Sequence, residues 1–195
     1  MREHPDWEGT GSMTIRDTTT GYGLVSRLFH WLTALVIVGL FAVGVWMVGL
    51  SYYHPYYHTA PHWHKSAGML LAAALVVRFV WRIANVKPSD DELKPWERRA
   101  AGLVHWGFYP LLLVIVVSGY LMSTADGRPI EVFNWFSIPS PGARPGLEDA
   151  AGAVHEWIAY AVIALAVVHS AAALKHHFVD RNDMLRRMWS GPPRS

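Results

Sequence analysis

Four long apolar segments dominate this chain of 195 residues. Three of them contain no Asp, Glu, Lys or Arg, and the fourth contains only Arg78 and Arg82, both near one of its ends. The segments are residues 28–50, 66–83, 100–125 and 157–174. A helix needs about 20 apolar residues, within a range of about 17–25, to cross a bilayer, so each segment is long enough. The charge-free segments also lack the polar stripe that a helix of a soluble protein presents to water. The sequence therefore predicts an all-α membrane protein, a bundle of four transmembrane helices.

Basic residues are concentrated in alternate segments of the chain. Fourteen of the 17 Lys and Arg residues lie in the N-terminal segment, in the second connection with the adjoining helix end, or in the C-terminal tail. The first and third connections hold only Lys65, Arg128 and Arg144. By the positive-inside rule we expect both termini to be cytoplasmic. Arg78 and Arg82 then lie at the inner end of the second helix, where they can reach the lipid headgroups.

The charge pattern also suggests how the chain is divided. We expect a polar tail at residues 1–20, a helical domain at residues 21–188 and a short tail at residues 189–195. The first 20 residues have no apolar core, so we expect no cleavable signal peptide. The third connection is rich in Pro and Gly and should fold over the outer end of the bundle. The four helices are expected at about 24–50, 64–86, 100–124 and 151–176.

The chain has eleven His residues and no Cys. The absence of Cys excludes disulfides, iron–sulfur clusters, thiolate metal sites and covalently attached c-type haem. A net charge of +2 is too small to indicate binding to nucleic acid. Imidazole is the commonest metal ligand in proteins, and here no thiolate competes with it.

Four histidines lie within or at the edge of the expected helices, at two depths. His30 and His169 lie near inner helix ends, whereas His64 and His155 lie near outer ends. His155 and His169 are separated by close to four helical turns, about 21 Å along the axis, so both project from nearly the same face. We therefore expect an inner pair of His30 with His169 and an outer pair of His64 with His155.

Two imidazoles at one depth suit a flat cofactor held inside a bundle, and a haem iron with two axial imidazoles is the natural occupant. Di-iron sites in bundles use Glu ligands, and Glu156 is the one carboxylate expected near a span. A zinc site would need three or four protein ligands at one depth. The competing interpretation is that these histidines only pack or hydrogen bond, and the matched depths favour ligands over it.

Two further residues near the inner helix ends are candidates for the site. His105 is a rival ligand that could replace His30; otherwise it hydrogen bonds a propionate or a quinone, or lies at the interface. Arg78 is expected to pair with a propionate of the inner haem, because an unpaired guanidinium is costly at that depth. The alternative for Arg78 is an extended side chain that reaches lipid phosphate.

Three outer histidines, His54, His58 and His62, have i, i+4 spacing. On one helix they could bind copper or zinc, but Pro55 and Pro61 argue against such a helix. The alternative is that they are surface residues.

Several short motifs carry a resemblance to a known family. They are Arg27-Leu-Phe-His30-Trp31, His64-Lys-Ser-Ala-Gly68, Gly102-Leu-Val-His105, His155-Glu156, His169-Ser-Ala-Ala-Ala-Leu-Lys-His176-His177 and Leu185-Arg-Arg-Met188. At these residues the chain resembles the bacterial cytochrome b561 family, small four-helix relatives of hydrogenase b-type cytochrome subunits. The resemblance extends from about Tyr22 to Met188.

The resemblance implies two b haems in the bacterial inner membrane, with bis-histidine ligation by His30, His64, His155 and His169. It also implies electron exchange with membrane quinone. Small members of the family resemble superoxide oxidases, which pass an electron from superoxide to ubiquinone.

Two functions remain open from the sequence. The first is a redox enzyme that oxidises a small donor, superoxide above all, at the outer face and reduces quinone. Lys65, next to His64, could attract an anionic donor; the alternative is that it neutralises a haem propionate or reaches the lipid headgroups. The second is a cytochrome subunit that anchors a partner dehydrogenase and relays its electrons. A transporter is disfavoured because the spans lack carboxylates for a relay. The sequence leaves open whether the chain forms a homodimer or binds a partner redox subunit.

Overall fold

The computed structural model describes residues 14–191 and shows an elongated bundle of four long helices. The helices are α1 (Leu24–Met47), α2 (Thr59–Ile83), α3 (Pro95–Thr124) and α4 (Leu147–Phe178). All four are long and apolar enough to cross a membrane, with mean hydropathies between 1.6 and 2.2. The fold is therefore the four-helix membrane bundle that the apolar segments predict. Most of the expected 20-residue N-terminal tail, and residues 192–195 of the C-terminal tail, lie outside the described residues.

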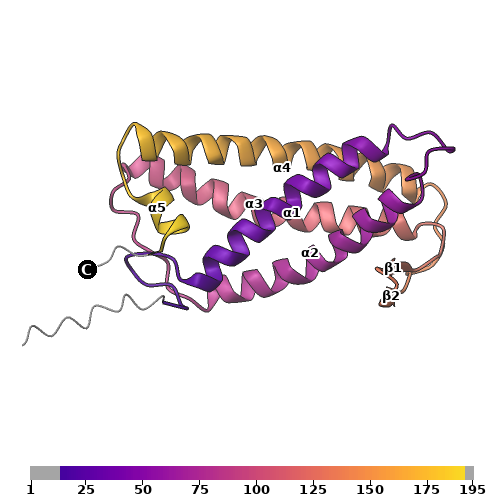
Figure 1. The fold of residues 1–195 in the computed structure, drawn as a ribbon, viewed down its shortest axis with the longest axis horizontal. Coiled ribbons are helices and arrows are strands. Elements are labelled where there is room, and N and C mark those ends of the chain that lie inside the picture. Colours follow the sequence, from indigo (N-terminus) through magenta and orange to yellow (C-terminus); the bar gives the residue numbers. More distant parts are fainter. Residues whose placement is uncertain (1–13, 192–195) are drawn as a thin grey trace, which may run out of the picture.

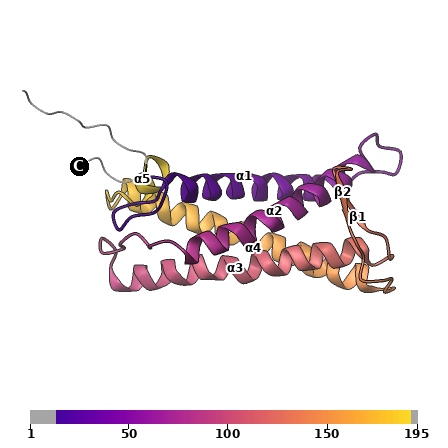
Figure 2. The same ribbon diagram turned by 90° about the horizontal axis from the view of Figure 1, so that it is seen from below.

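The described ends of the chain, Thr14 and Gly191, lie at the same end of the bundle (Figures 1 and 2). We call this the terminal end; it also carries the connection between α2 and α3. The opposite end, here the loop end, carries residues 48–58 and residues 125–146. In space α3 packs mainly on α4 and α1 mainly on α2, and α1 crosses the other helices obliquely in Figure 1.

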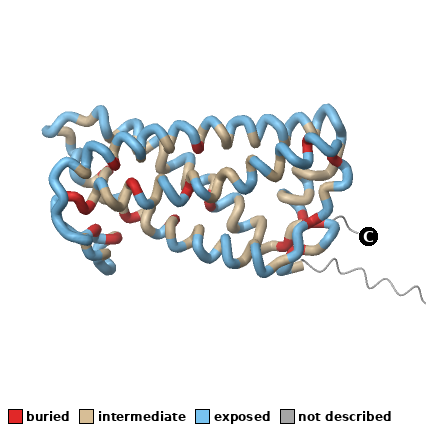
Figure 3. The backbone as a smooth tube through the Cα atoms, turned by 180° about the vertical axis from the view of Figure 1, so that it is seen from behind, coloured by how far each residue is buried: buried red, intermediate tan, exposed pale blue. Residues whose placement is uncertain are grey.

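Burial is sparse along the four helices, as Figure 3 shows. Large apolar side chains such as Leu35, Val76, Leu103 and Val167 are exposed on the helix surfaces. In water this much exposed apolar surface would be unfavourable, whereas it suits contact with lipid chains. Few side chains of the four helices are fully buried, among them Ser66 and Val162.

Local contacts and residue types explain where α1, α3 and α4 begin. The carboxylate of Asp17 accepts hydrogen bonds from the backbone N–H of Gly23 and from the hydroxyl of Ser26, both at 2.8 Å, and so ties the preceding segment to the first turn of α1. Helix α3 begins at Pro95, whose fixed φ suits a first helical position. Helix α4 follows Gly146, which has a φ of 83° that glycine adopts without strain.

The third connection is an ordered structure at the loop end. It contains a small antiparallel hairpin of β1 (Ile130–Val132) and β2 (Phe136–Ile138). The fully buried hydroxyl of Ser66 on α2 donates to the carbonyl of Glu131 at 3.1 Å and accepts from the N–H of Phe133 at 3.0 Å. The side chain of Ser66 thus docks the hairpin on α2, two residues after His64.

A short helix, α5 (Met184–Trp189), covers part of the terminal end. The indole N–H of Trp31 donates to the carbonyl of Met188 at 3.1 Å, and the rings of Trp31 and Trp189 meet edge to face with centroids 5.3 Å apart. Helix α5 therefore fastens the C-terminal segment to the beginning of α1.

Candidate functional site

Two pairs of histidines lie inside the bundle, one at each end. At the loop end the ring centroids of His64 on α2 and His155 on α4 are 6.2 Å apart, with 75° between the ring planes. At the terminal end the centroids of His30 on α1 and His169 on α4 are 6.3 Å apart, with 61° between the planes. The structure thus brings together the residues that were paired by depth, and α4 contributes one histidine to each pair.

The spacing of the rings can be compared with that of two imidazoles on opposite sides of one metal ion. With metal–nitrogen bonds of about 2.0–2.1 Å and about 1.1 Å from nitrogen to ring centre, the centroids lie about 6.3 Å apart. Both pairs match this value. The rings of His105 and His169 are only 5.3 Å apart, which is too close for such an arrangement. His30 therefore fits opposite His169 better than His105 does.

The ring of His155 is oriented by the backbone of α3. Its Nδ1 lies 2.8 Å from the carbonyl oxygen of Ile115 and 3.5 Å from the hydroxyl of Ser118. A carbonyl can only accept, so Nδ1 carries the proton and donates to it, which leaves the lone pair of Nε2 free for a ligand. A half-buried histidine held in this tautomer is suited to bind a metal through Nε2.

Glycines lie directly against the rings of the loop-end pair. A Cβ atom on Gly119 would be 2.8 Å from Cε1 of His155, and one on Gly44 would be 3.3 Å from Cε1 of His64. The Nδ1 atom of His64 is also buried without a hydrogen-bond partner in the described residues. The absence of a side chain at Gly44 and Gly119 therefore gives both rings room beside α1 and α3.

Arg78 on α2 lies at the terminal-end pair. Its Nη2 atom is 3.4 Å from Nδ1 of His30, and no carboxylate within residues 14–191 forms an ion pair with it. A guanidinium without a carboxylate partner, beside this half-buried pair, is suited to neutralise an acidic group of a ligand held there. These contacts fit a haem, which carries two propionates.

Lys65 and the three outer histidines lie at the loop end. Lys65 lines a groove beside the end of α1 and makes no ion pair in the described part of the chain. His54, His58 and His62 do not converge on one point, because His54 precedes α2, His58 caps it and His62 lies in its first turns. The structure therefore offers no copper or zinc site at these histidines.

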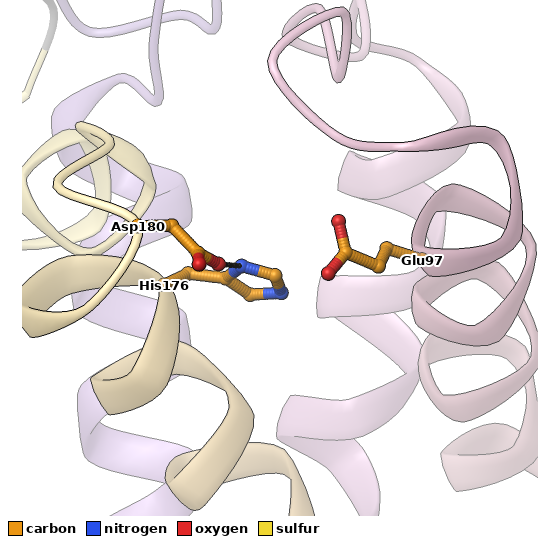
Figure 4. A group of neighbouring side chains, drawn as sticks. All are labelled: Glu97, His176 and Asp180. Atoms are coloured by element: carbon orange, nitrogen blue, oxygen red, sulfur yellow. Dashed lines mark hydrogen bonds and ion pairs between the residues drawn. The ribbon is translucent and has the colours of Figure 1, made fainter.

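The one group of three potential metal ligands within residues 14–191 lies elsewhere, at the terminal end (Figure 4). It consists of Glu97 on α3 with His176 and Asp180 near the end of α4. The ammonium of Lys175 lies 2.9 Å from Glu97 and 2.6 Å from Asp180, so a cation already neutralises these carboxylates. Hydrogen bonds from Lys175 and His176 hold the pKa of Asp180 below its usual value. We interpret the group as an ion-pair cluster that ties α3 to α4.

Sequence reasoning missed several of these residues. Glu97 belongs to α3, which begins five residues before the expected position, so Glu156 is not the only carboxylate near a span. The contacts of Ile115 and Gly119 with His155 carry no sequence signal, because they depend on how α3 and α4 pack. Ser66 had a signal, as a hydroxyl within the His64–Gly68 motif.

Comparison with known proteins gives a consistent result. The family described as prokaryotic cytochrome b561 matches residues 21–191. The chain is 48% identical over 178 residues to cytochrome b561 homolog 2 of Escherichia coli (strain K12), covering 90% of this chain and 95% of that protein. It is 28% identical over 166 residues to cytochrome b561 homolog 1 of the same organism, covering 82% of this chain and 91% of that protein.

Proposed function

Because the chain belongs to the prokaryotic cytochrome b561 family, we propose that it holds two b haems and passes electrons between a small donor outside the cell membrane and membrane quinone. Family and fold identify a multi-pass protein of the bacterial inner membrane and a b-type cytochrome of electron transfer.

The observation that carries the proposal is the equal spacing of the two histidine pairs. Centroid distances of 6.2 and 6.3 Å suit one iron between each pair of rings. We assign one haem to His64 and His155 and the other to His30 and His169. A haem held by two histidines has no open coordination site, so it supplies one-electron transfer rather than oxygen binding. The chain's own part is to hold the rings, exclude water and place charge.

A haem count per chain tests the ligand assignment. We expect a pyridine-haemochrome assay to give two b haems in the purified protein. His64→Ala and His155→Ala should each remove one haem, and His30→Ala and His169→Ala should each remove the other. The matched control is His105→Ala, which should keep both haems because its ring is too close to His169 for shared ligation. A count near one in the unchanged protein would contradict the proposal, and so would loss of a haem in His105→Ala but not in His30→Ala.

We also propose that the terminal end faces the cytoplasm, since it holds most of the basic residues. The loop end and the pair of His64 and His155 then face outward. A small anion such as superoxide crosses a low-dielectric bilayer poorly, so it must react on the side where it is formed. Lys65, which has no carboxylate partner in the described residues, lies beside the outward pair and can raise the local concentration of an anion.

Superoxide as donor is testable by stopped-flow reduction of the haem. The rate should fall with ionic strength and in Lys65→Gln, because the attraction is electrostatic. Arg128→Gln is the matched control: Arg128 lies 3.2 Å from Asp126 and is already paired, so its loss should matter less. Equal rates in both variants and at all ionic strengths would remove the role of Lys65. No reduction by superoxide would instead favour a cytochrome subunit that relays electrons for a partner dehydrogenase.

A further inference from the structure

An open groove of about 440 Å³ lies at the terminal end, between α1 and the short helix α5. Trp31 and Leu35 of α1 form one wall, and Trp189 of α5 forms the other. Figure 2 shows α5 lying beside the beginning of α1. Leu35 and Trp189 are 70% and 69% exposed, so the described part of the chain leaves this apolar surface uncovered.

The wall on α1 continues a stripe that changes from charged to apolar with depth. Arg27, Trp31 and Leu35 follow the spacing i, i+4, i+8, which places them on one face of α1. At 1.5 Å per residue, Trp31 lies about 6 Å and Leu35 about 12 Å farther from the terminal end than Arg27 does. A phospholipid has the same order along its length: a charged phosphate, polar ester groups and then apolar chains. The stripe therefore matches a lipid that stands parallel to α1.

Arg27 is in direct contact with the groove. Its Nη2 atom donates a hydrogen bond to the backbone carbonyl of Trp189 at 2.5 Å, which places the guanidinium at the edge of the α5 wall. No carboxylate within residues 14–191 forms an ion pair with Arg27. Arg187 on α5 differs, because it pairs with Glu92. The polar end of the groove thus carries a positive charge that the described residues do not neutralise.

The walls are held in place by contacts within the protein. The indole N–H of Trp31 donates to the carbonyl of Met188, and the ring of Trp31 packs edge to face on that of Trp189. The groove is therefore already formed before a ligand enters, which lowers the entropic cost of binding.

These features favour an anionic lipid over a zwitterionic one. No carboxylate lines the groove, so the ammonium of a zwitterionic headgroup would have no counter-charge there. We propose that the groove binds one anionic phospholipid, with its phosphate on Arg27 and an acyl chain along Trp31, Leu35 and Trp189. The bound lipid would fasten α5 to the bilayer. The inference is independent of the proposed function, because it requires neither a particular electron donor nor a particular face of the membrane.

The first test is native mass spectrometry of the full chain in detergent micelles. Phosphatidylglycerol and phosphatidylcholine with the same acyl chains are offered in equal amounts, and we expect one phosphatidylglycerol to be retained preferentially. Arg27→Gln should weaken its binding at least about tenfold, since one charge-assisted contact with the phosphate is lost. Arg99→Gln is the matched control and should leave binding unchanged. Arg99 is an exposed arginine of α3 at the same end that makes no ion pair in the described residues.

A second pair of variants tests the apolar wall without touching the charge. Leu35→Trp should fill the groove and abolish retention of phosphatidylglycerol. Leu32→Trp is its control, because Leu32 is 59% exposed on the same helix but does not line the groove.

Thermal unfolding provides a readout that does not depend on the mass spectrometer. Phosphatidylglycerol should raise the Tm of the unchanged protein and of Leu32→Trp, and it should not raise that of Arg27→Gln or Leu35→Trp. Inorganic phosphate should have no effect, because it lacks the chains that occupy the groove.

Equal retention of the two lipids, or equal losses in Arg27→Gln and Arg99→Gln, would overturn the proposal. Stabilisation by inorganic phosphate alone would overturn it as well, because the apolar wall would then have no part in binding. A dimer that retains no lipid and that Leu35→Trp dissociates would show that a second copy of the chain covers the groove instead.

Discussion

Gly119 offers the sharpest test of how the loop-end pair is held. In Gly119→Ala the new Cβ would be 2.8 Å from Cε1 and 2.9 Å from Nδ1 of His155. Carbon atoms in good contact are about 3.5–4.0 Å apart, so the ring would have to retreat by about 0.7–1.2 Å. The hydrogen bond from its Nδ1 to Ile115, 2.8 Å long, would then stretch beyond bonding distance.

The expected cost follows from these distances. An added methyl group in a packed site costs about 1–3 kcal/mol. That range corresponds to about 5- to 150-fold weaker haem binding at the loop-end pair. Gly44→Ala should cost less, because its Cβ would meet His64 at 3.3 Å and a shift of a few tenths of an ångström relieves the contact. Gly107→Ala is the control on α3, since nothing within residues 14–191 lies within 4 Å of its Cβ position.

The assay is a haem titration of each variant, followed by absorbance, together with the haem count at saturation. We expect Gly119→Ala to retain the terminal-end haem and to bind the loop-end haem weakly, with Gly44→Ala intermediate and Gly107→Ala unchanged. Full occupancy with unchanged affinity in Gly119→Ala would refute the reasoning. It would show that His155 has more freedom than its contacts with α3 suggest.

Three further predictions concern other residues. Arg78→Gln should lower the redox potential of the terminal-end haem, because a nearby positive charge favours the reduced form; an unchanged redox titration would favour a contact with lipid phosphate instead. Ser66→Ala should loosen the hairpin by about 1–3 kcal/mol and speed chymotryptic cleavage after Phe133, and unchanged cleavage would mean that the hairpin stays docked without the hydroxyl. Asp180→Asn should lower the thermal stability at neutral pH. Because the pKa of Asp180 is lowered in the folded chain, its ion pair stabilises the fold at pH values above the usual Asp pKa, and this stabilisation is lost as the pH falls through the lowered pKa. The Tm values of the variant and the unchanged protein should therefore converge in acid. A constant difference in Tm would contradict this.

The helices and the pairing of histidines could be predicted because both depend on properties that sequence spacing records. A run of apolar residues fixes a span, and a separation of nearly four turns places His155 and His169 on one face. The beginnings of the helices were less predictable. Helix α2 begins at Thr59, before the expected residue 64, since Pro61 falls in its first turn, where a helix tolerates proline.

The supporting contacts could not be read in advance. The carbonyl of Ile115 contacts His155 only because α3 packs on α4. The local sequence does not indicate which helices pack on each other. Helix α5 is a similar case: six residues are too few for a helix to be stable alone, so its form depends on Trp31 and the rest of the terminal end. Tertiary packing determines both the contact of Ile115 with His155 and the formation of α5, and the local sequence pattern specifies neither.

Helix α4 contributes one histidine to each pair, so this single helix sets the distance between the two sites. The stretch between His155 and His169 has a fixed rise, so the distance between the two sites does not depend on how the other helices tilt or slide. Its rotational register is equally strict: one residue inserted between them would turn His169 by about 100° away from His30. Deletion or insertion of one residue between His155 and His169 should therefore disable one site completely, whereas similar changes in the loops should leave both intact.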